Sequence, residues 1–349
     1  MSMKRRQLFA SAAAGAAILS RPGWAGPAEP WRRFEITTRV TLMGDGPAQL
    51  WLPLAQTVGG YQSASDPTTT GSGHAVVTHD ATYGADVLRV DWTGSAERTI
   101  DVVQVVATRD RSSSDPTLPV TEAERRFWRS PTGSLPTDGI VKTTAEKIVA
   151  GQSEPRAKLR AIYDWVVDHT TRNPDTPGCG VGDITAMLES GHLTGKCVDI
   201  NSLMTGLSRA AGFPARDVYG IRVGPSHRFP FLGAGGTITK AQHCRSEVYL
   251  PDRGWFPVDP ADVAKVVLEQ KLTLQDPQVR ALREYLFGSW EMNWVGFNSA
   301  TDIDLPGLGS DQKPNFAFLM YPCAFVGAQQ PDTLEPASFR YEIMSRELT

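Results

Sequence analysis

The chain has few of the cysteine and histidine residues that bind transition metals. Its 349 residues include only four cysteines and six histidines, and the histidines are scattered, at positions 74, 79, 169, 192, 227 and 243. No C-x-x-C pair occurs, although structural zinc sites are built from closely spaced ligands of this kind. A calcium-binding loop of the D-x-D-x-D-G type is also absent. We therefore expect neither a metal ion nor a cofactor.

The chain also lacks an excess of positive charge. The formal net charge is −3, and removal of residues 1–25, which carry four basic residues and no acidic one, would lower it to about −7. A mildly acidic chain argues against nucleic acid or an anionic membrane as the main partner. With 41% hydrophobic and 21% charged residues, the composition is that of a globular protein, and the length is sufficient for two domains.

No apolar run is long enough to span a bilayer. The first residues instead have the order of an export signal: basic residues at 4–6, an apolar stretch from Leu8 to Leu19, and a small residue, Ala25, before a cleavage point. Paired arginines are typical of the twin-arginine route, and an ordinary secretory signal also fits. Residues 1–25 are therefore predicted to be a signal peptide, which would place the mature protein in the periplasm or outside the cell.

The remaining chain divides by pattern into four regions. Apolar and polar residues alternate between 34 and 42, as in a half-buried strand, and residues 31–110 predict a small β-sandwich-like domain. We expect this domain to be a packing module without chemistry. Residues 111–150 would form a linker with short helices, 151–270 a core of helices and strands, and 271–349 a C-terminal extension packed on that core.

Cys197 stands at the start of a predicted helix. Apolar residues follow it at helical spacing, at Ile200, Leu203, Met204 and Leu207. Gly212 ends the pattern, as glycine does after many helices. A thiol in the first helical turn lies near unpaired backbone N–H groups and the positive end of the helix dipole, and both favour thiolate. Most cysteines are nevertheless small, buried and unreactive, so the helix alone does not establish a function.

A predicted hairpin between 244 and 258 brings two more polar residues together. His243 opens its first strand, Asp259 ends its second, and residues 251–254 have the composition of a turn. Symmetric pairing would place Asp259 opposite roughly Ser246, so a bulge or a register offset is needed for His243 and Asp259 to meet. Alternatively, His243 is an edge-strand residue and Asp259 only caps the next helix. The irregular segment 224–240 before the hairpin is either a wall of a substrate cleft or a surface insertion.

Cys197, His243 and Asp259 have the chemistry of a thiol triad. Cys197 would attack a carbonyl carbon as thiolate, His243 would pass a proton to the leaving amine, and Asp259 would orient the imidazole. The backbone N–H of Cys197 would stabilise the oxyanion, and the sequence does not identify a second donor. If Cys197 is free, at least one of the other three cysteines is unpaired even in a compartment that permits disulfides.

Four sequence blocks carry a resemblance to a known family: GKCVD at 195–199, LSRAAGFPAR at 207–216, HCRSEV at 243–248 and GWFPVDP at 254–260. With them, residues 156–262 resemble the transglutaminase-like superfamily of papain-related thiol enzymes. The flanks resemble a bacterial exported branch and extend the likeness to about 150–349. The resemblance implies an α+β fold with a nucleophile helix packed on an antiparallel sheet, and makes 151–270 the catalytic core. It also implies Cys197 as nucleophile, His243 as base and acid, and Asp259 as the residue that orients His243.

Enzymes of this kind work through a thioester, and the acyl acceptor determines the product. Water gives hydrolysis of peptide, isopeptide or glutamine amide bonds, whereas a primary amine gives protein cross-linking. A catalytically silent binding protein on the same fold is a third alternative. We expect an exported cysteine hydrolase or acyltransferase whose substrate is a peptide or protein, from the cell envelope or among other exported proteins. The sequence does not determine its oligomeric state.

Overall fold

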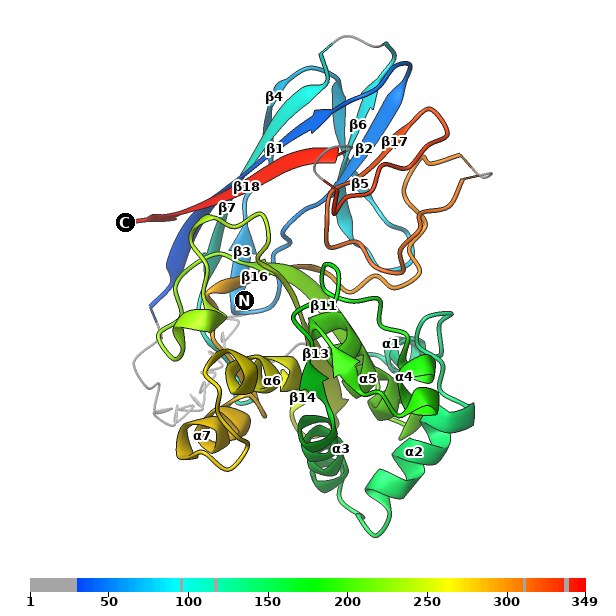
Figure 1. Ribbon diagram of the computed structural model, residues 1–349, viewed down its shortest axis with the longest axis vertical. Helices are drawn as coiled ribbons and strands as arrows, with labels where there is room; N and C mark the ends of the chain where they lie inside the picture. Colours follow the sequence, from blue (N-terminus) through cyan, green and yellow to red (C-terminus); the bar gives the residue numbers. More distant parts are fainter. Residues whose placement is uncertain (1–29, 95–96, 116–118, 310–311, 336–338) are drawn as a thin grey trace, which may run out of the picture. The chain divides into compact units, whose positions relative to one another are not determined.

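The computed structural model describes residues 30–94, 97–115, 119–309, 312–335 and 339–349. The predicted signal peptide, residues 1–25, lies outside them. Along β1 (Arg32–Leu42), buried residues alternate with partly exposed ones, because one face of the strand lies in a core. That core lies between two sheets and includes Val40, Leu50, Leu88 and Val102. The predicted sandwich is therefore present (Figure 1).

The first sheet of the sandwich has the strand order β12–β18–β1–β7–β3, and β4 also pairs with β7. Its other strands are β3 (Gln62–Ala64), β4 (Thr68–Gly71), β7 (Thr99–Thr108), β12 (Gly236–Thr237) and β18 (Phe339–Leu348). The second sheet has the order β17–β2–β6–β5. Its strands are β2 (Ala48–Pro53), β5 (His74–His79), β6 (Asp86–Trp92) and β17 (Cys323–Val326).

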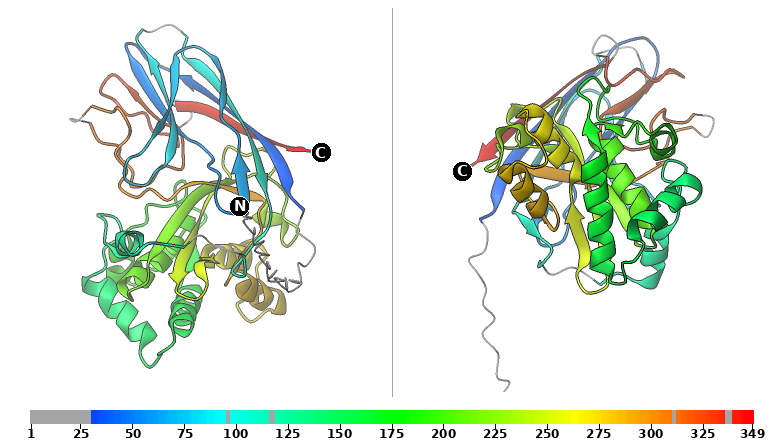
Figure 2. Two further views of the ribbon diagram at one scale, coloured as in Figure 1. Left: turned by 180° about the vertical axis from the view of Figure 1, so that it is seen from behind. Right: turned by 60° about the horizontal axis from the view of Figure 1, so that its bottom comes forward.

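The strands β17 and β18 belong to the sandwich, although residues 271–349 were predicted to pack on the catalytic core as an extension. Another part of that segment, β16 (Trp294–Asn298), does pair with residues 219–222 of the core sheet. β18 is antiparallel to β1 from the Arg33–Leu348 pair to the Leu42–Phe339 pair, and β17 is antiparallel to β2. Figure 2 shows the C-terminal strand lying along β1. Pairing between segments about 300 residues apart depends on which sheet edges are free in the folded chain, and no local pattern in the sequence encodes it.

The core of the second region is a helix packed on an antiparallel sheet of order β14–β13–β11–β16. These strands are β11 (Ala215–Arg222), β13 (Gln242–Leu250), β14 (Gly254–Val258) and β16 (Trp294–Asn298). Helix α5 (Cys197–Ala210) packs on β13 and β11. Around it lie α2 (Gly139–Val149), α3 (Pro155–His169) and α6 (Pro260–Glu269). The predicted fold class, a nucleophile helix on an antiparallel sheet, is confirmed.

Helix α5 is buried on nearly all sides, so its polar residues need partners inside the protein. The hydroxyl groups of Ser202 and Thr205 donate to the Asp217 carboxylate on β11, at 2.6 and 2.5 Å. Ser246 Oγ on β13 donates to the carbonyl oxygen of Asn201 at 3.0 Å. These bonds hold the helix in register with the sheet, and the apolar stripe predicted from the sequence describes only part of the contact.

Short elements complete the fold. They are β8 (Arg111–Ser112), α1 (Glu122–Arg129), β9 (Thr171–Arg172), α4 (Ile184–Ser190), β10 (Thr194–Gly195), the 3₁₀ helix η1 (Pro230–Leu232), α7 (Pro277–Tyr285) and β15 (Ser289–Trp290). Helix α2 packs on α5, so the segment predicted as a linker contributes to the helical layer. Among the described residues, no helix has the length and apolar character needed to cross a membrane.

Candidate active site

Cys197 is the first residue of α5, as predicted, and its side chain is 3% exposed. The first turn of the helix is closed by Asp199, whose Oδ2 accepts a hydrogen bond from the Lys196 N–H at 2.9 Å. The described residues provide no hydrogen-bond acceptor for the Cys197 N–H. This donor is therefore available at the start of the helix.

Asp199 also holds a preceding loop against the helix. Its Oδ1 accepts from the N–H groups of Val181 and Gly182, at 3.0 and 2.9 Å. A Cβ atom at Gly180, where φ is +93°, would overlap the Asp199 carboxylate, so only glycine permits this approach. The loop carries Cys179 to a position beside Cys197. Asp199 was not predicted to have a role, although an acidic residue in a first helical turn is a recognisable signal.

The hairpin places His243 and Asp259 on the same face of the sheet. Ser246 pairs with Val258, which puts Asp259 opposite Arg245, one residue from the predicted position. His243 is then diagonal to Asp259, two residues along the strand, where side chains share a face. His243 Nε2 and Asp259 Oδ2 are 2.8 Å apart. The contact between His243 and Asp259 therefore depends on an offset register. The sequence required either such an offset or a bulge.

Asp259 has two structural roles at once. Its second oxygen, Oδ1, accepts from the Asp262 N–H at 3.1 Å and caps helix α6, and it also accepts from Asn201 Nδ2 at 3.2 Å. The alternative interpretation of Asp259 as a helix cap is therefore correct, and it does not exclude the contact with His243. Because Nε2 of His243 faces Asp259, Nδ1 is the ring nitrogen available to Cys197.

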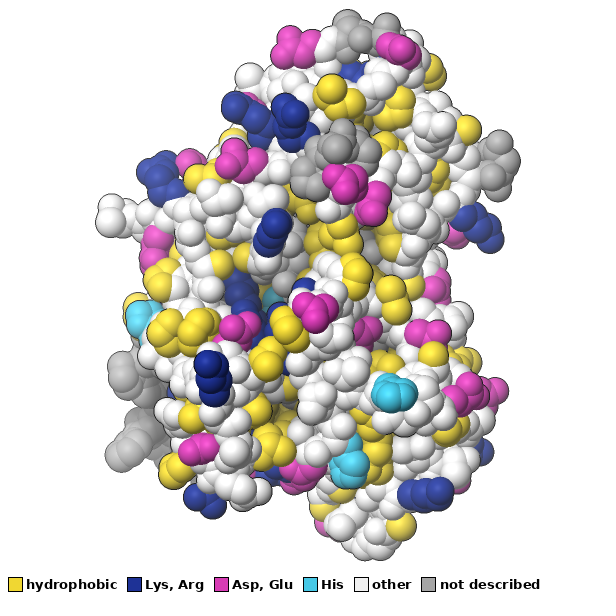
Figure 3. Space-filling view, in the orientation of Figure 1, with side chains coloured by type: hydrophobic (Ala, Val, Ile, Leu, Met, Phe, Trp, Pro, Cys, Tyr) yellow, Lys and Arg dark blue, Asp and Glu magenta, His cyan; other side chains and the backbone are white. Residues whose placement is uncertain are grey.

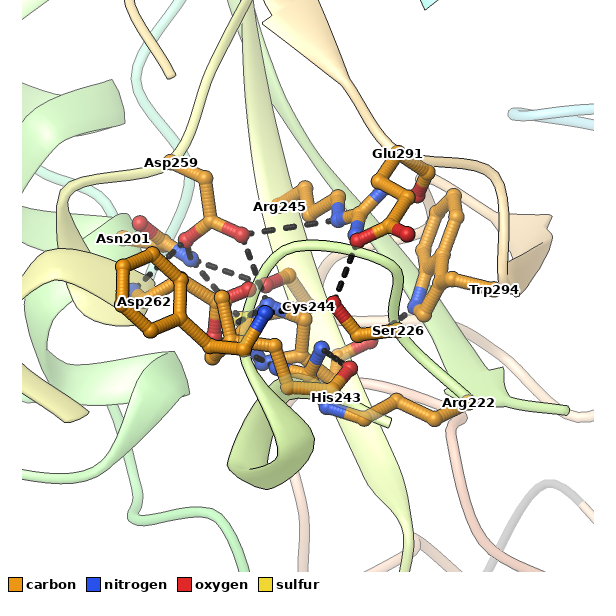
Figure 4. A network of polar contacts seen from close by, with 12 residues as sticks. Asn201, Arg222, Ser226, His243, Cys244, Arg245, Asp259, Asp262, Glu291 and Trp294 are labelled. Carbon is orange, nitrogen blue, oxygen red and sulfur yellow. Dashed lines mark hydrogen bonds and ion pairs between the residues drawn. The ribbon is translucent and has the colours of Figure 1, made fainter. Parts of the chain in front are cut away.

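Arg245 supports Asp259 from inside the sheet and was not predicted. Its side chain is fully buried, and Nε lies 3.4 Å from Asp259 Oδ2 (Figure 4). Nη1 donates to the Glu291 carbonyl oxygen at 3.0 Å, and the guanidinium lies 4.8 Å from the ring centroid of Trp294. A charged residue in a strand usually indicates solvent exposure, which is why the sequence carried no signal for this contact.

A second ion pair borders the same network. Arg222 Nη2 and Asp262 Oδ1 are 2.5 Å apart, and Asp262 Oδ1 lies 3.5 Å from His243 Nε2. His243, Asp259 and Asp262 are close enough together to bind a metal ion. The carboxylates, however, already face the guanidinium groups of Arg222 and Arg245, whose charges would repel a cation. The cluster therefore fits a charge network around His243 better than a metal site.

The surroundings of Cys197 and His243 favour their charged forms. Hydrogen bonds with the thiols of Cys179 and Cys244 and with His243 lower the pKa of Cys197 well below its ordinary value, although burial opposes this. Burial and Arg222 lower the pKa of His243, but Asp262 and Asp259 together raise it by more. A lowered thiol pKa beside a raised imidazole pKa is the condition for a thiolate–imidazolium pair.

A cleft of about 710 Å³ opens at Cys197, and its lining also includes Cys179, Gln242 and His243. Residues 233, 234 and 237–241 line it too, so the irregular segment forms a cleft wall, the first of the two predicted alternatives. Figure 3 shows a hollow near the centre of one face, with basic side chains and a histidine recessed in it. All four cysteines are free and buried.

Comparison with known proteins identifies the family. Residues 142–260 match the transglutaminase-like superfamily, and this segment includes Cys197, His243 and Asp259. An uncharacterized protein of Haemophilus influenzae is 36% identical over 341 residues, which cover 90% of this chain and 91% of that protein. The chain belongs to the transglutaminase-like superfamily.

The fold of the chain is also similar to that of solved structures. The crystal structure of a candidate cysteine protease from Cytophaga hutchinsonii superposes with a TM-score of 0.57 at 14% sequence identity, over 92% of each chain. At this identity the likeness concerns the fold alone. The periplasmic domain of TgpA from Pseudomonas aeruginosa matches more loosely, with a TM-score of 0.38 and 17% identity, over 68% of this chain and 91% of that domain.

Proposed function

We propose that the protein is a cysteine-dependent amide hydrolase that cleaves peptide, isopeptide or glutamine amide bonds through a thioester. One observation carries the proposal: Cys197 of α5 and His243 of β13 line the same cleft, and Asp259 at the end of β14 contacts His243 at 2.8 Å. The superfamily fold and the lowered thiol pKa support it. The proposed triad assigns nucleophile, proton carrier and orienting carboxylate to these residues in that order.

In the proposed reaction, the Cys197 thiolate attacks the carbonyl carbon of the substrate amide and forms a tetrahedral intermediate. The His243 imidazolium then donates its proton to the amine, the C–N bond breaks, and the acyl group remains on sulfur as a thioester. A water molecule, deprotonated by the now neutral His243, attacks the thioester. The C–S bond breaks, the carboxylic acid leaves, and the thiolate–imidazolium pair is restored.

We propose two donors for the oxyanion. One is the Cys197 N–H at the start of α5, and the other is the side-chain amide of Gln242, which lines the same cleft. The Gln242 Nε2 is buried and has no hydrogen-bond partner among the described residues. Buried amide nitrogens normally have partners, so a ligand oxygen would satisfy this group. We assign Gln242 as the second donor that the sequence did not identify.

The test compares Cys197→Ala with Cys323→Ala, which removes a buried thiol from β17 in the sandwich, outside the cleft lining. We expect Cys197→Ala to abolish both hydrolysis of a peptide and glutamine-amide library and iodoacetamide labelling at neutral pH, while Cys323→Ala retains both. Unchanged turnover in Cys197→Ala would reject the proposal. Incorporation of a labelled primary amine without release of free acid would instead indicate a cross-linking enzyme, and absence of any thioester would indicate a binding protein.

We also propose that the protein acts outside the cytoplasm. The support is the sequence pattern of residues 1–25, with its basic start and apolar stretch. Cell fractionation of the full-length chain, compared with a chain in which residues 4–6 are changed to glutamine, tests it. Equal cytoplasmic retention of both chains would contradict export, and selective sensitivity to loss of the twin-arginine machinery would identify the route.

A further inference from the structure

The cleft at Cys197 is lined by basic side chains and by no carboxylate of the described residues. The basic residues come from segments far apart in the sequence and are Arg172, Lys196, Arg222, Lys240, Lys265 and Arg340. The whole chain, by contrast, has a formal charge of −3. Charge of one sign on the walls of a cleft concentrates the electrostatic potential there and attracts a ligand of the opposite sign.

Most of these basic side chains are not paired with a carboxylate of the described residues. Arg222 pairs with Asp262 at 2.5 Å, but the other five form no ion pair with any residue that the structure describes. Arg172 Nε is buried and has no hydrogen-bond partner in the described part of the chain. A buried donor without a partner is destabilising, so a ligand that supplies an acceptor would account for its position.

Arg172, Arg222 and Lys265 are close enough to influence one another. Lys265 lies on α6, which packs on β9, the strand that contains Arg172. Burial and the charges of Arg222 and Arg172 lower the pKa of Lys265 to about 8, although Asp262 and the exposed Glu269 raise it. Mutual repulsion among cations that are buried, like Arg222, or half-buried, like Arg172 and Lys265, is costly in the free protein, and such arrangements are typical of functional sites.

These cations lie next to the proposed nucleophile. Arg172 pairs across β9 and β10 with Gly195, two residues before Cys197, and Lys196 directly precedes Cys197. An anionic group held by Arg172 and Lys265 would therefore lie within the same cleft as the amide that the thiolate attacks. Carboxylates suit this purpose because arginine binds them through two parallel N–H donors, and charge-assisted hydrogen bonds are the strong ones.

We propose that Arg172 and Lys265, assisted by Lys196, form an anion subsite that selects acidic peptides, whose carboxylate side chains flank the amide to be cleaved. This assignment of the substrate class rests on the proposed function. It concerns binding, however, and can be tested without turnover. The test therefore uses the full-length chain with Cys197→Ser, which retains the cleft and cannot form a thioester.

The probes are two fluorescent peptides of equal length with amidated C-termini, one rich in glutamate and the other rich in serine, so that only the first carries side-chain carboxylates and neither carries a glutamine amide. Fluorescence anisotropy at low ionic strength should give at least tenfold tighter binding of the glutamate peptide. Arg172→Gln and Lys265→Gln, each in the Cys197→Ser background, should weaken its binding by roughly three- to tenfold. The matched controls Arg280→Gln and Lys147→Gln change exposed basic residues on α7 and α2 and should leave the affinity unaltered.

Equal affinity for the two peptides would overturn the assignment. So would an equal loss of affinity in the control variants, because the preference would then reflect general surface charge. If the glutamate peptide binds selectively but wild-type protein hydrolyses no amide, the subsite stands and the proposed function fails. If wild-type protein hydrolyses a neutral peptide library without any preference for acidic members, the proposed function stands and the subsite fails.

Discussion

Replacing Asp259 by asparagine removes one charge while keeping the shape of the side chain. Oδ1 of Asp259 accepts hydrogen bonds from Asn201 Nδ2 and the Asp262 N–H, at 3.2 and 3.1 Å, whereas Oδ2 faces His243 Nε2 at 2.8 Å. In Asp259→Asn the amide oxygen has to remain at the position that receives two donors, so the NH₂ group points at His243. A ring nitrogen that accepts this N–H cannot carry a proton, and His243 is then held neutral.

The size of the effect follows from the bond that is lost. A hydrogen bond to a charged group contributes about 1.5–3 kcal/mol, and one pKa unit corresponds to about 1.4 kcal/mol. The pKa of His243 should therefore fall by about one to two units, and the Cys197 thiolate loses its cationic partner. Because the substitution also fixes the wrong tautomer, we expect kcat/KM to fall by roughly 10²-fold or more.

The assay is the rate of iodoacetamide alkylation of Cys197 as a function of pH. Wild-type protein should react rapidly near neutral pH, and Asp259→Asn should move the inflection toward the ordinary thiol value of about 8.5. Asp183→Asn is a matched control, because Asp183 also caps a helix, accepting from the Ala186 N–H at 2.9 Å, and does not line the cleft. If Asp259→Asn is alkylated at the wild-type rate with an unmoved inflection, Asp259 does not support the imidazolium.

Three further outcomes are expected. The rate of turnover should have a bell-shaped dependence on pH. The lowered pKa of Cys197 allows thiolate to form below about pH 8.5, and the raised pKa of His243 keeps the imidazolium protonated above about pH 6.5. A single rise in rate centred near pH ~8.5 would contradict the thiolate–imidazolium pair. Gln242→Ala should lower kcat by about 10²-fold with little change in KM, and an unchanged kcat would exclude it as oxyanion donor. Asp199→Asn would place an NH₂ group against the Lys196 N–H, where two donors face each other. The free energy of unfolding, measured in urea, should therefore fall by about 1–3 kcal/mol. An unchanged free energy of unfolding would contradict the role of Asp199 in holding the loop.

Local signals were sufficient to predict the elements that carry the proposed triad. Helical spacing of apolar residues and a terminal glycine gave the bounds of α5, and a turn sequence gave the hairpin of β13 and β14. Each of these elements is continuous in the sequence, so the spacing of its apolar residues and the turn or glycine residues at its ends are enough to predict it. The register was the exception, since one residue of offset decides whether His243 and Asp259 share a face.

The surroundings of the proposed triad could not be predicted in the same way. Arg245 is buried because Asp259 from one segment, and Glu291 and Trp294 from another, contact it. Asp199 acts on a loop that lies 17 residues before it. Each of these side chains looks like an ordinary surface residue until its distant partners are known, because burial of a charge is decided by tertiary contacts.

The β-sandwich, expected to be a packing module, contributes to the surface that a substrate would meet. Phe339, Arg340 and Tyr341 of β18 line the cleft. The wall that the irregular segment forms is joined to the same strand, because β12 pairs with β18 through Gly236–Ser345 and Thr237–Met344. The proposed nucleophile and its partners lie within the segment that matches the superfamily, residues 142–260, as do four of the six basic residues of the cleft. The strand β18 adds Arg340 and two aromatic side chains to the lining. Proteins that share the three residues of the proposed triad can therefore differ in the part of the cleft that β18 forms.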